Sequence, residues 1–228
     1  MPRARPSEHE FRQTAATQNG SGCFSAYSLP LFAVALITCF LIALSSNMPM
    51  YRSALPLQNP IETKGISPIF TREVQYWAND IIRWANASSL DPDLVAVVMQ
   101  IESCGDPLAT SSAGAMGLFQ VMPFHFHVGE NPYHPETNAL RGLNYLSRSL
   151  KTAQGDVRLA LAGYNGGIGI ISRGERTWPA QTKRYVQYGA PIYEDAQAGA
   201  SQSIHLQEWY VRYGAALCRQ AARRLGLP

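Results

Sequence analysis

The stretch from residue 101 to residue 123 reads IESCGDPLATSSAGAMGLFQVMP, and it decides what kind of fold the chain has. An apolar run leads into Glu102, and Gly105 and Pro107 then end the predicted helix. A segment rich in Gly, Ala and Ser follows, whose small residues allow the backbone to approach a ligand or another segment closely. The hydroxyl of Ser111 and the amide of Gln120 lie within it, and these groups suit the amides and hydroxyls of an N-acetylated sugar.

Glu102 is a candidate acid catalyst because of its place at the C-terminal end of a helix. The negative end of the helix dipole disfavours a further negative charge, and apolar neighbours remove water from the carboxylate. Both effects raise the carboxyl pKa, and a carboxylic acid that stays protonated near neutral pH can cleave a glycosidic bond. The alternative is an ordinary solvent-exposed glutamate at a helix end.

Helical periodicity dominates the chain around this segment. The apolar spacing predicts a helix over residues 74–85, a second one that starts at Asp91 and Pro92, and a third from Asn138. A fourth runs from Asp156 to the glycine pair at 166–167, and an amphipathic helix covers residues 206–221. No run of strands and no internal repeat occurs in the sequence, so we expect a mainly α domain.

Three blocks of sequence resemble the soluble lytic transglycosylase (SLT) family, which has a lysozyme-like fold. The first runs from Glu102-Ser103 through the small residues to Gln120 and Pro123. The second contains Asn138, Gly142, Tyr145 and Leu146, and the third is Ala-Gly-Tyr-Asn-Gly-Gly at 162–167. The resemblance covers residues 91–185. It departs from the family pattern at Gly163, which replaces an alanine, and at Gln181, which replaces a glutamate and removes a carboxylate from one corner of the cleft.

The resemblance implies an enzyme that cuts peptidoglycan glycan strands without a cofactor. It implies that Glu102 is the single catalytic acid/base and that Tyr164 orients it or stabilises charge beside it. Ser111, Gln120 and Met122 would contact the sugar rings and their N-acetyl groups. Asn165 would shape the floor of the cleft. For Met122 and Tyr164 the alternative is packing in the core.

The reaction implied is cleavage of the MurNAc-GlcNAc β-1,4 bond with formation of a 1,6-anhydromuramoyl end. Most glycosidases use two carboxylates, whereas this variant uses one together with the substrate's own groups. Two alternatives remain open at this point. One is a hydrolytic muramidase similar to goose-type lysozyme, and the other is a non-catalytic peptidoglycan-binding module.

An uncharged stretch over residues 13–51, with an apolar centre at 29–44, predicts a transmembrane signal anchor over residues 29–47. Arg3, Arg5 and Arg12 precede it, which favours a disordered cytoplasmic tail over 1–28 and an extracytoplasmic catalytic domain. A Pro-containing linker over 48–70 and the domain over 71–228, with a C-terminal helical extension, would follow. The alternatives are a cleaved signal peptide, with Ala43 and Ser45 before the cut, or a buried core helix.

The net charge and the cysteines indicate which binding partners and which cross-link to expect. The formal net charge is +3 and no long Lys/Arg run occurs, so nucleic acid is not indicated. Export would place Cys104 and Cys218 in an oxidising compartment, and we expect them to form a disulfide that holds the last helix beside the Glu102 segment. The alternative is two buried free thiols. The sequence predicts no oligomeric state.

The segment after Pro123 contains several histidines and aromatic residues. A zinc site built from the histidines and Glu130 is one interpretation, but His-x-His in a loop is more often solvated or packed, and the reaction needs no metal, so we expect none. The aromatic residues would form either a sugar-stacking wall or part of the core. The histidines are His125, His127 and His134, and the aromatic residues are Phe124, Phe126 and Tyr133.

Overall fold

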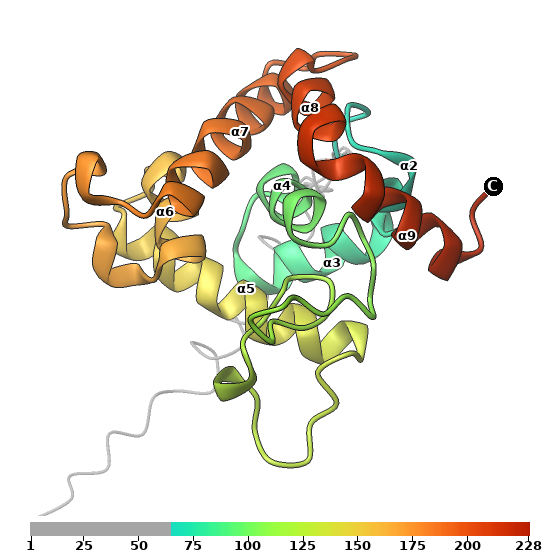
Figure 1. Cartoon of the computed structure of the whole chain (residues 1–228), viewed down its shortest axis with the longest axis horizontal. Helices are drawn as coiled ribbons and strands as arrows, with labels where there is room; N and C mark the ends of the chain where they lie inside the picture. Colours follow the sequence, from blue (N-terminus) through green and yellow to red (C-terminus); the bar gives the residue numbers. More distant parts are fainter. Residues whose placement is uncertain (1–64) are drawn as a thin grey trace, which may run out of the picture. The chain divides into compact units, whose positions relative to one another are not determined.

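The computed structural model describes residues 65–228, and it is mainly helical (Figure 1). No strand occurs within this range, where the only β pairing is two isolated bridges, Thr110–Met116 and Met116–Val121. The predicted mainly α class is therefore confirmed for the described part of the chain. Its α-helices are α2 (Arg72–Gln75), α3 (Ala78–Ser88), α4 (Pro92–Glu102), α5 (Pro135–Thr152), α6 (Val157–Gly166), α7 (Ala180–Gln197), α8 (Ile204–Trp209) and α9 (Ala215–Leu225).

Helix α4 lies in the middle of the other described helices and ends on Glu102 (Figure 1). Asp91 caps its N-terminus, where one carboxylate oxygen accepts hydrogen bonds from the backbone N–H groups of Asp93 and Leu94. Every residue from Asp93 to Gln100 is buried, as expected of a helix packed on all sides. The apolar sequence of α4 thus fixes the helix in the core, and Glu102 is the last residue of this helix.

The predicted helix over 74–85 is interrupted, because α2 ends at Gln75 and α3 begins at Ala78. At the break, the indole N–H of Trp77 donates to the carbonyl of Gly105 at 2.9 Å. A tertiary contact with the segment after α4 therefore overrides the periodic pattern. Helices α4 and α6 begin after their aspartate caps as predicted, whereas α5 begins three residues before Asn138, at Pro135.

The C-terminal half differs more from the prediction. Helix α7 was not predicted from the sequence, and it contains Pro191 in its interior. The amphipathic helix over 206–221 consists of α8, a π-helical turn η4 (Tyr210–Gly214) and α9. A Cβ on Gly214 would lie 2.4 Å from the ring of Trp209, so the absence of a side chain at Gly214 allows this indole to pack against the backbone.

The packed core extends upstream of the predicted domain start at Thr71, because Ile66, Ile69 and Phe70 are buried in it. The predicted tail, the transmembrane helix over 29–47 and the linker up to residue 64 lie outside the described residues. Among residues 65–228, no helix has both the length and the apolar character needed to cross a bilayer.

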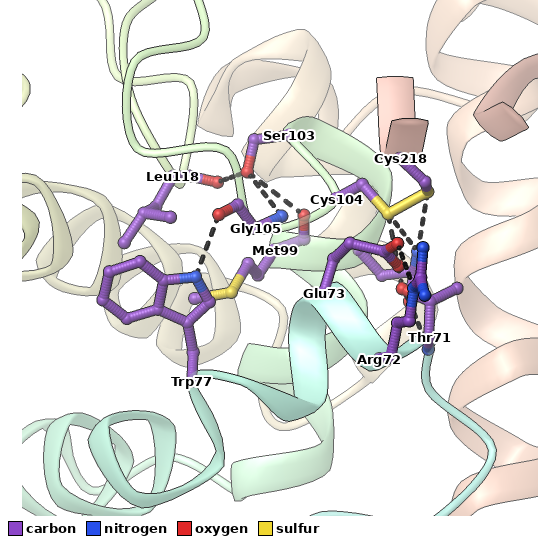
Figure 2. The surroundings of a disulfide bond; sticks show 11 residues. Thr71, Arg72, Glu73, Trp77, Met99, Ser103, Cys104, Gly105, Leu118 and Cys218 are labelled. Atoms are coloured by element: carbon purple, nitrogen blue, oxygen red, sulfur yellow. Dashed lines mark hydrogen bonds and ion pairs between the residues drawn. A yellow bond between two sulfur atoms is a disulfide. The ribbon is translucent and has the colours of Figure 1, made fainter. Parts of the chain in front are cut away.

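Cys104 and Cys218 form a disulfide, as predicted, which joins the segment after α4 to α9 (Figure 2). The sulfur of Cys104 also lies 3.1 Å from the side-chain nitrogen of Gln100 and 3.3 Å from the hydroxyl of Thr71. Both cysteines are buried. Two chain segments that are 114 residues apart in sequence are therefore held together at Cys104, two residues after Glu102.

An ion pair between the buried Asp106 and the exposed Arg224 reinforces this connection. The carboxylate of Asp106 is fully buried and accepts two hydrogen bonds from the Arg224 guanidinium, at 2.9 and 2.7 Å. The side-chain amide of Gln220 donates a third, at 2.7 Å. Without Arg224, the buried Asp106 carboxylate would lose its countercharge in the interior. Both covalent and ionic contacts therefore fix α9 against the segment that follows Glu102.

Candidate active site

One cleft of about 380 Å³ opens beside the end of α4. The Gly/Ala-rich segment after α4, the helices α5 and α6 and the start of α7 supply its walls. All six residues that the sequence singled out for catalysis or substrate binding line it, although they come from three separate parts of the chain: Glu102, Ser111, Gln120, Met122, Tyr164 and Asn165.

Glu102 is half-buried at the cleft wall, and loss of solvent raises the pKa of its carboxyl to about 8. A loose contact with the hydroxyl of Tyr185 lowers this pKa in part. The Tyr185 hydroxyl is buried and makes no hydrogen bond of normal geometry within residues 65–228. Near neutral pH Glu102 is therefore mainly a neutral acid that faces the cleft, which suits it to donate a proton.

Glu102 is the only carboxylate among the described residues that line this cleft. Gln181, at the position where the family pattern has a glutamate, also lines it and contributes an uncharged amide. The departure noted in the sequence therefore lies in the cleft itself. Any chemistry there has one carboxyl group for both proton donation and proton acceptance.

The Gly/Ala-rich segment is folded by its own hydrogen bonds into a compact wall of the cleft. The hydroxyl of Ser111 accepts from the backbone N–H of Ala115 at 3.0 Å. Gln120 adopts a positive φ of 46°, and its side-chain nitrogen donates to the carbonyls of Ala109 and Gly117 at 3.3 and 3.0 Å. The side chains of Ser111 and Gln120 are thus held in place before any ligand binds.

Asn138 fixes this wall from behind. Its fully buried amide donates to the carbonyls of Met116 and Pro132, both at 2.8 Å, and accepts from the N–H of Phe119 at 2.8 Å. Gly117 has a φ of +73°, and a Cβ there would lie 2.3 Å from the Asn138 amide. The sequence indicated Asn138 only as part of a motif. Its structural role emerges from contacts that sequence spacing does not reveal.

Tyr164 and Asn165 reach the cleft from the C-terminal end of α6. The Tyr164 hydroxyl donates to the carbonyl of Phe119 at 2.7 Å, which fixes the ring against the wall. Burial and the nearby Glu102 carboxylate raise the Tyr164 pKa, so its phenol stays neutral. The Asn165 side-chain oxygen accepts from the buried hydroxyl of Thr182, at 3.0 Å.

A row of rings forms one side of the cleft, in the order Phe124, His125, Tyr145 and Tyr164. Consecutive ring centroids lie 4.5, 4.9 and 5.8 Å apart. Phe124 is 74% exposed, as a residue that stacks a sugar ring must be. Of the three aromatic residues proposed for such a wall, only Phe124 lines the cleft, because Phe126 packs against the core and the Tyr133 hydroxyl pairs with Thr110.

The structure does not group His125, His127 and His134 into a metal-binding set. Within residues 65–228, one cluster has the spacing of a metal site, and it consists of Glu73, Cys104 and Cys218. Both sulfurs of that cluster are joined in the disulfide, so neither is available as a thiolate ligand (Figure 2).

The part of the chain that matches known proteins includes the residues that line the cleft. Residues 79–187 match the model of the transglycosylase SLT domain family. The transglycosylase of Enterobacteria phage PRD1 is 42% identical over 115 residues, which are 49% of this chain and 40% of the phage protein. The chain thus matches less than half the length of that relative. A solved lytic transglycosylase Slt from Pseudomonas aeruginosa is 24% identical over 53% of this chain and 24% of its own, with a TM-score of 0.44.

Proposed function

We propose, because residues 79–187 match the model of the transglycosylase SLT domain family, that this protein is a peptidoglycan lytic transglycosylase. Its substrate is the MurNAc-GlcNAc β-1,4 bond of glycan strands, and its product is a 1,6-anhydromuramoyl end. Glu102 is the catalytic residue in both halves of the reaction, and Tyr164 is its neutral partner at the cleft wall. Ser111, Gln120, Met122 and Asn165 bind the sugars.

The observation that best supports this reaction is that Glu102 is the only carboxylate among the described residues that line the cleft. A retaining or an inverting glycosidase of the common type needs a second carboxylate, as nucleophile or as base for water. Among the described residues, no second carboxylate lines the cleft, and Gln181 contributes only an uncharged amide. A nucleophile supplied by the substrate removes the need for that group.

The steps follow from the protonation state of Glu102. The neutral carboxyl first protonates the glycosidic oxygen, and the bond from this oxygen to C1 of MurNAc breaks. The substrate's acetamido group or the cleft dipoles stabilise the positive charge on C1. The Glu102 carboxylate then removes the proton from the C6 hydroxyl of the same sugar, whose oxygen attacks C1. The proton returns to Glu102, and no water is consumed. The intramolecular attack has a high effective concentration.

Product analysis tests the proposed reaction. We expect sacculi digested with the purified full-length protein to release muropeptides with anhydro ends, which are one water (about 18 Da) lighter than reducing ends. Mass spectrometry distinguishes them. Digestion in water enriched in ¹⁸O serves as the control, because a hydrolase would incorporate the label. Labelled reducing ends would identify a muramidase instead, and binding to sacculi without turnover would identify a non-catalytic module.

We further propose that the catalytic domain lies outside the cytoplasm, anchored to the bacterial membrane by the segment over 29–47. The Cys104–Cys218 pair suits an oxidising compartment, where the substrate also lies. We expect alkaline phosphatase, which needs export to fold, to be active when fused after residue 64 and inactive when fused after residue 12. Recovery of the fusion in the membrane fraction would favour an anchor over a cleaved signal. An inactive fusion after residue 64 would overturn the proposed export.

A further inference from the structure

A second pocket of about 250 Å³ lies on the other side of Glu102. It shares Glu102, Asn165 and Gln181 with the main cleft, so the two spaces meet at the catalytic carboxyl. Its remaining walls come from Ile101 of α4, from α7 and from the C-terminal extension, which supplies Trp209 and Tyr213. The family match ends at residue 187, so the extension adds walls that the matched domain does not include.

Arg184 gives this pocket its charge. Its guanidinium lies 5.4 Å from the centre of the Tyr213 ring, and the Tyr213 ring in turn packs edge-on against Tyr188, at 5.6 Å. Arg184 forms no ion pair with any residue of 65–228, and no acidic group other than Glu102 lines the pocket among these residues. A cation stacked on an aromatic ring is held in place while its N–H groups stay available to an anion.

The dimensions and chemistry of the pocket define its occupant. A pocket for a whole small ligand usually has about 300–1,000 Å³, so this one suits a single residue-sized group and not a second disaccharide. A planar guanidinium binds carboxylates with two parallel hydrogen bonds. Peptidoglycan strands have short peptides with free carboxylates attached to their muramic acid residues, and these peptides project away from the glycan chain beside the bond that is cut.

We infer that the C-terminal extension completes a recognition pocket for a carboxylate of the peptide attached to the glycan, with Arg184 as the anion-binding group and Tyr213 as its support. This inference rests on the proposed function, because the peptide that the pocket would bind is part of the same peptidoglycan substrate. It gives the disulfide and the Asp106–Arg224 pair a functional consequence, since they fix α9 and thereby the turn that contains Tyr213.

A binding measurement tests the pocket without depending on turnover. The probe is the disaccharide GlcNAc-MurNAc with its peptide, which lacks the MurNAc-GlcNAc linkage that would be cut. It is compared with the same compound after amidation of its carboxyl groups. We expect the full-length protein to bind the free-acid form about tenfold more tightly, as expected for one charge-assisted contact, and Arg184→Gln to abolish that difference.

Arg212→Gln is the matched control, because it removes the same charge from the same extension, and Arg212 lines a separate groove on α8 and η4. We expect it to retain the tenfold difference. A difference that persists in Arg184→Gln, or that is missing from the unmodified protein, would overturn the peptide pocket. Neither result would affect the anhydro product, so failure of the pocket and failure of the proposed reaction are distinguishable.

Discussion

Glu102→Gln should fold normally and lose at least about a thousandfold in the rate of strand cleavage. General acid–base catalysis by one group is worth about 10²–10⁴-fold, and here the same carboxyl acts in both proton transfers. The amide keeps the size of the side chain but cannot donate the proton to the glycosidic oxygen. The measurement is release of soluble muropeptides from purified sacculi by equal amounts of folded protein.

Glu208→Gln makes the same chemical change at an exposed glutamate of α8, away from both pockets that contain Glu102, and should keep full activity. If Glu102→Gln releases muropeptides at more than a tenth of the normal rate, Glu102 is not the catalytic acid. A melting curve shows whether Glu102→Gln is inactive only because it is unfolded. The structure also predicts how the melting temperature of this variant, relative to the unmodified protein, depends on pH.

The sign of that dependence follows from the raised pKa. In the unfolded chain the Glu102 carboxyl ionises around its ordinary value of 4.5, whereas in the folded protein it ionises around 8. Between these values the folded state binds the extra proton, so this group makes the protein less stable as the pH rises through that window. Glu102→Gln removes this loss. Its melting temperature should exceed that of the unmodified protein at pH 9 and differ little from it at pH 4.

The sequence predicted the surroundings of Glu102 well because they depend on local features. An aspartate cap, an apolar run and a glycine stop define α4 within the fifteen residues from Asp91 to Gly105, and the structure has the helix over Pro92–Glu102. The cleft residues were found by spacing within three blocks, and they line one cleft. The Asn138 hydrogen bonds that hold the Gly/Ala-rich wall connect segments about twenty residues apart, and no local pattern indicates which groups they join.

Helix α7 was missed because its buried face mixes apolar residues such as Val186 and Ile192 with hydroxyl-bearing residues and a glycine. That face includes Tyr185, Tyr188 and Gly189, and Pro191 lies within the helix although proline normally ends one. Packing against α4 and α6 stabilises the helix despite this cost. The second pocket was missed for a related reason, because Arg184 and Tyr213 are far apart in sequence and meet only when the C-terminal extension folds back onto α7.

Replacing both cysteines, in the double variant Cys104→Ala/Cys218→Ala, should lower the free energy of unfolding by about 2–5 kcal/mol. The disulfide connects residues 114 positions apart, and a cross-link that closes so long a loop removes much of the conformational freedom of the unfolded chain. Urea unfolding of the full-length double variant and of the unmodified protein, monitored by tryptophan fluorescence, gives the difference.

The control is the unmodified protein unfolded in the presence of a reductant, which should lose stability by a similar amount, while the double variant should be insensitive to reductant. Alanine leaves a small cavity and also removes the two sulfur partners of the buried Gln100 side-chain amide, so a loss seen only in the variant would indicate these local effects and not the cross-link. Equal unfolding midpoints in all four measurements would contradict a structural role for the bond. Because Asp106 and Arg224 still hold α9 in the folded state, the double variant should retain strand cleavage under conditions in which it is folded.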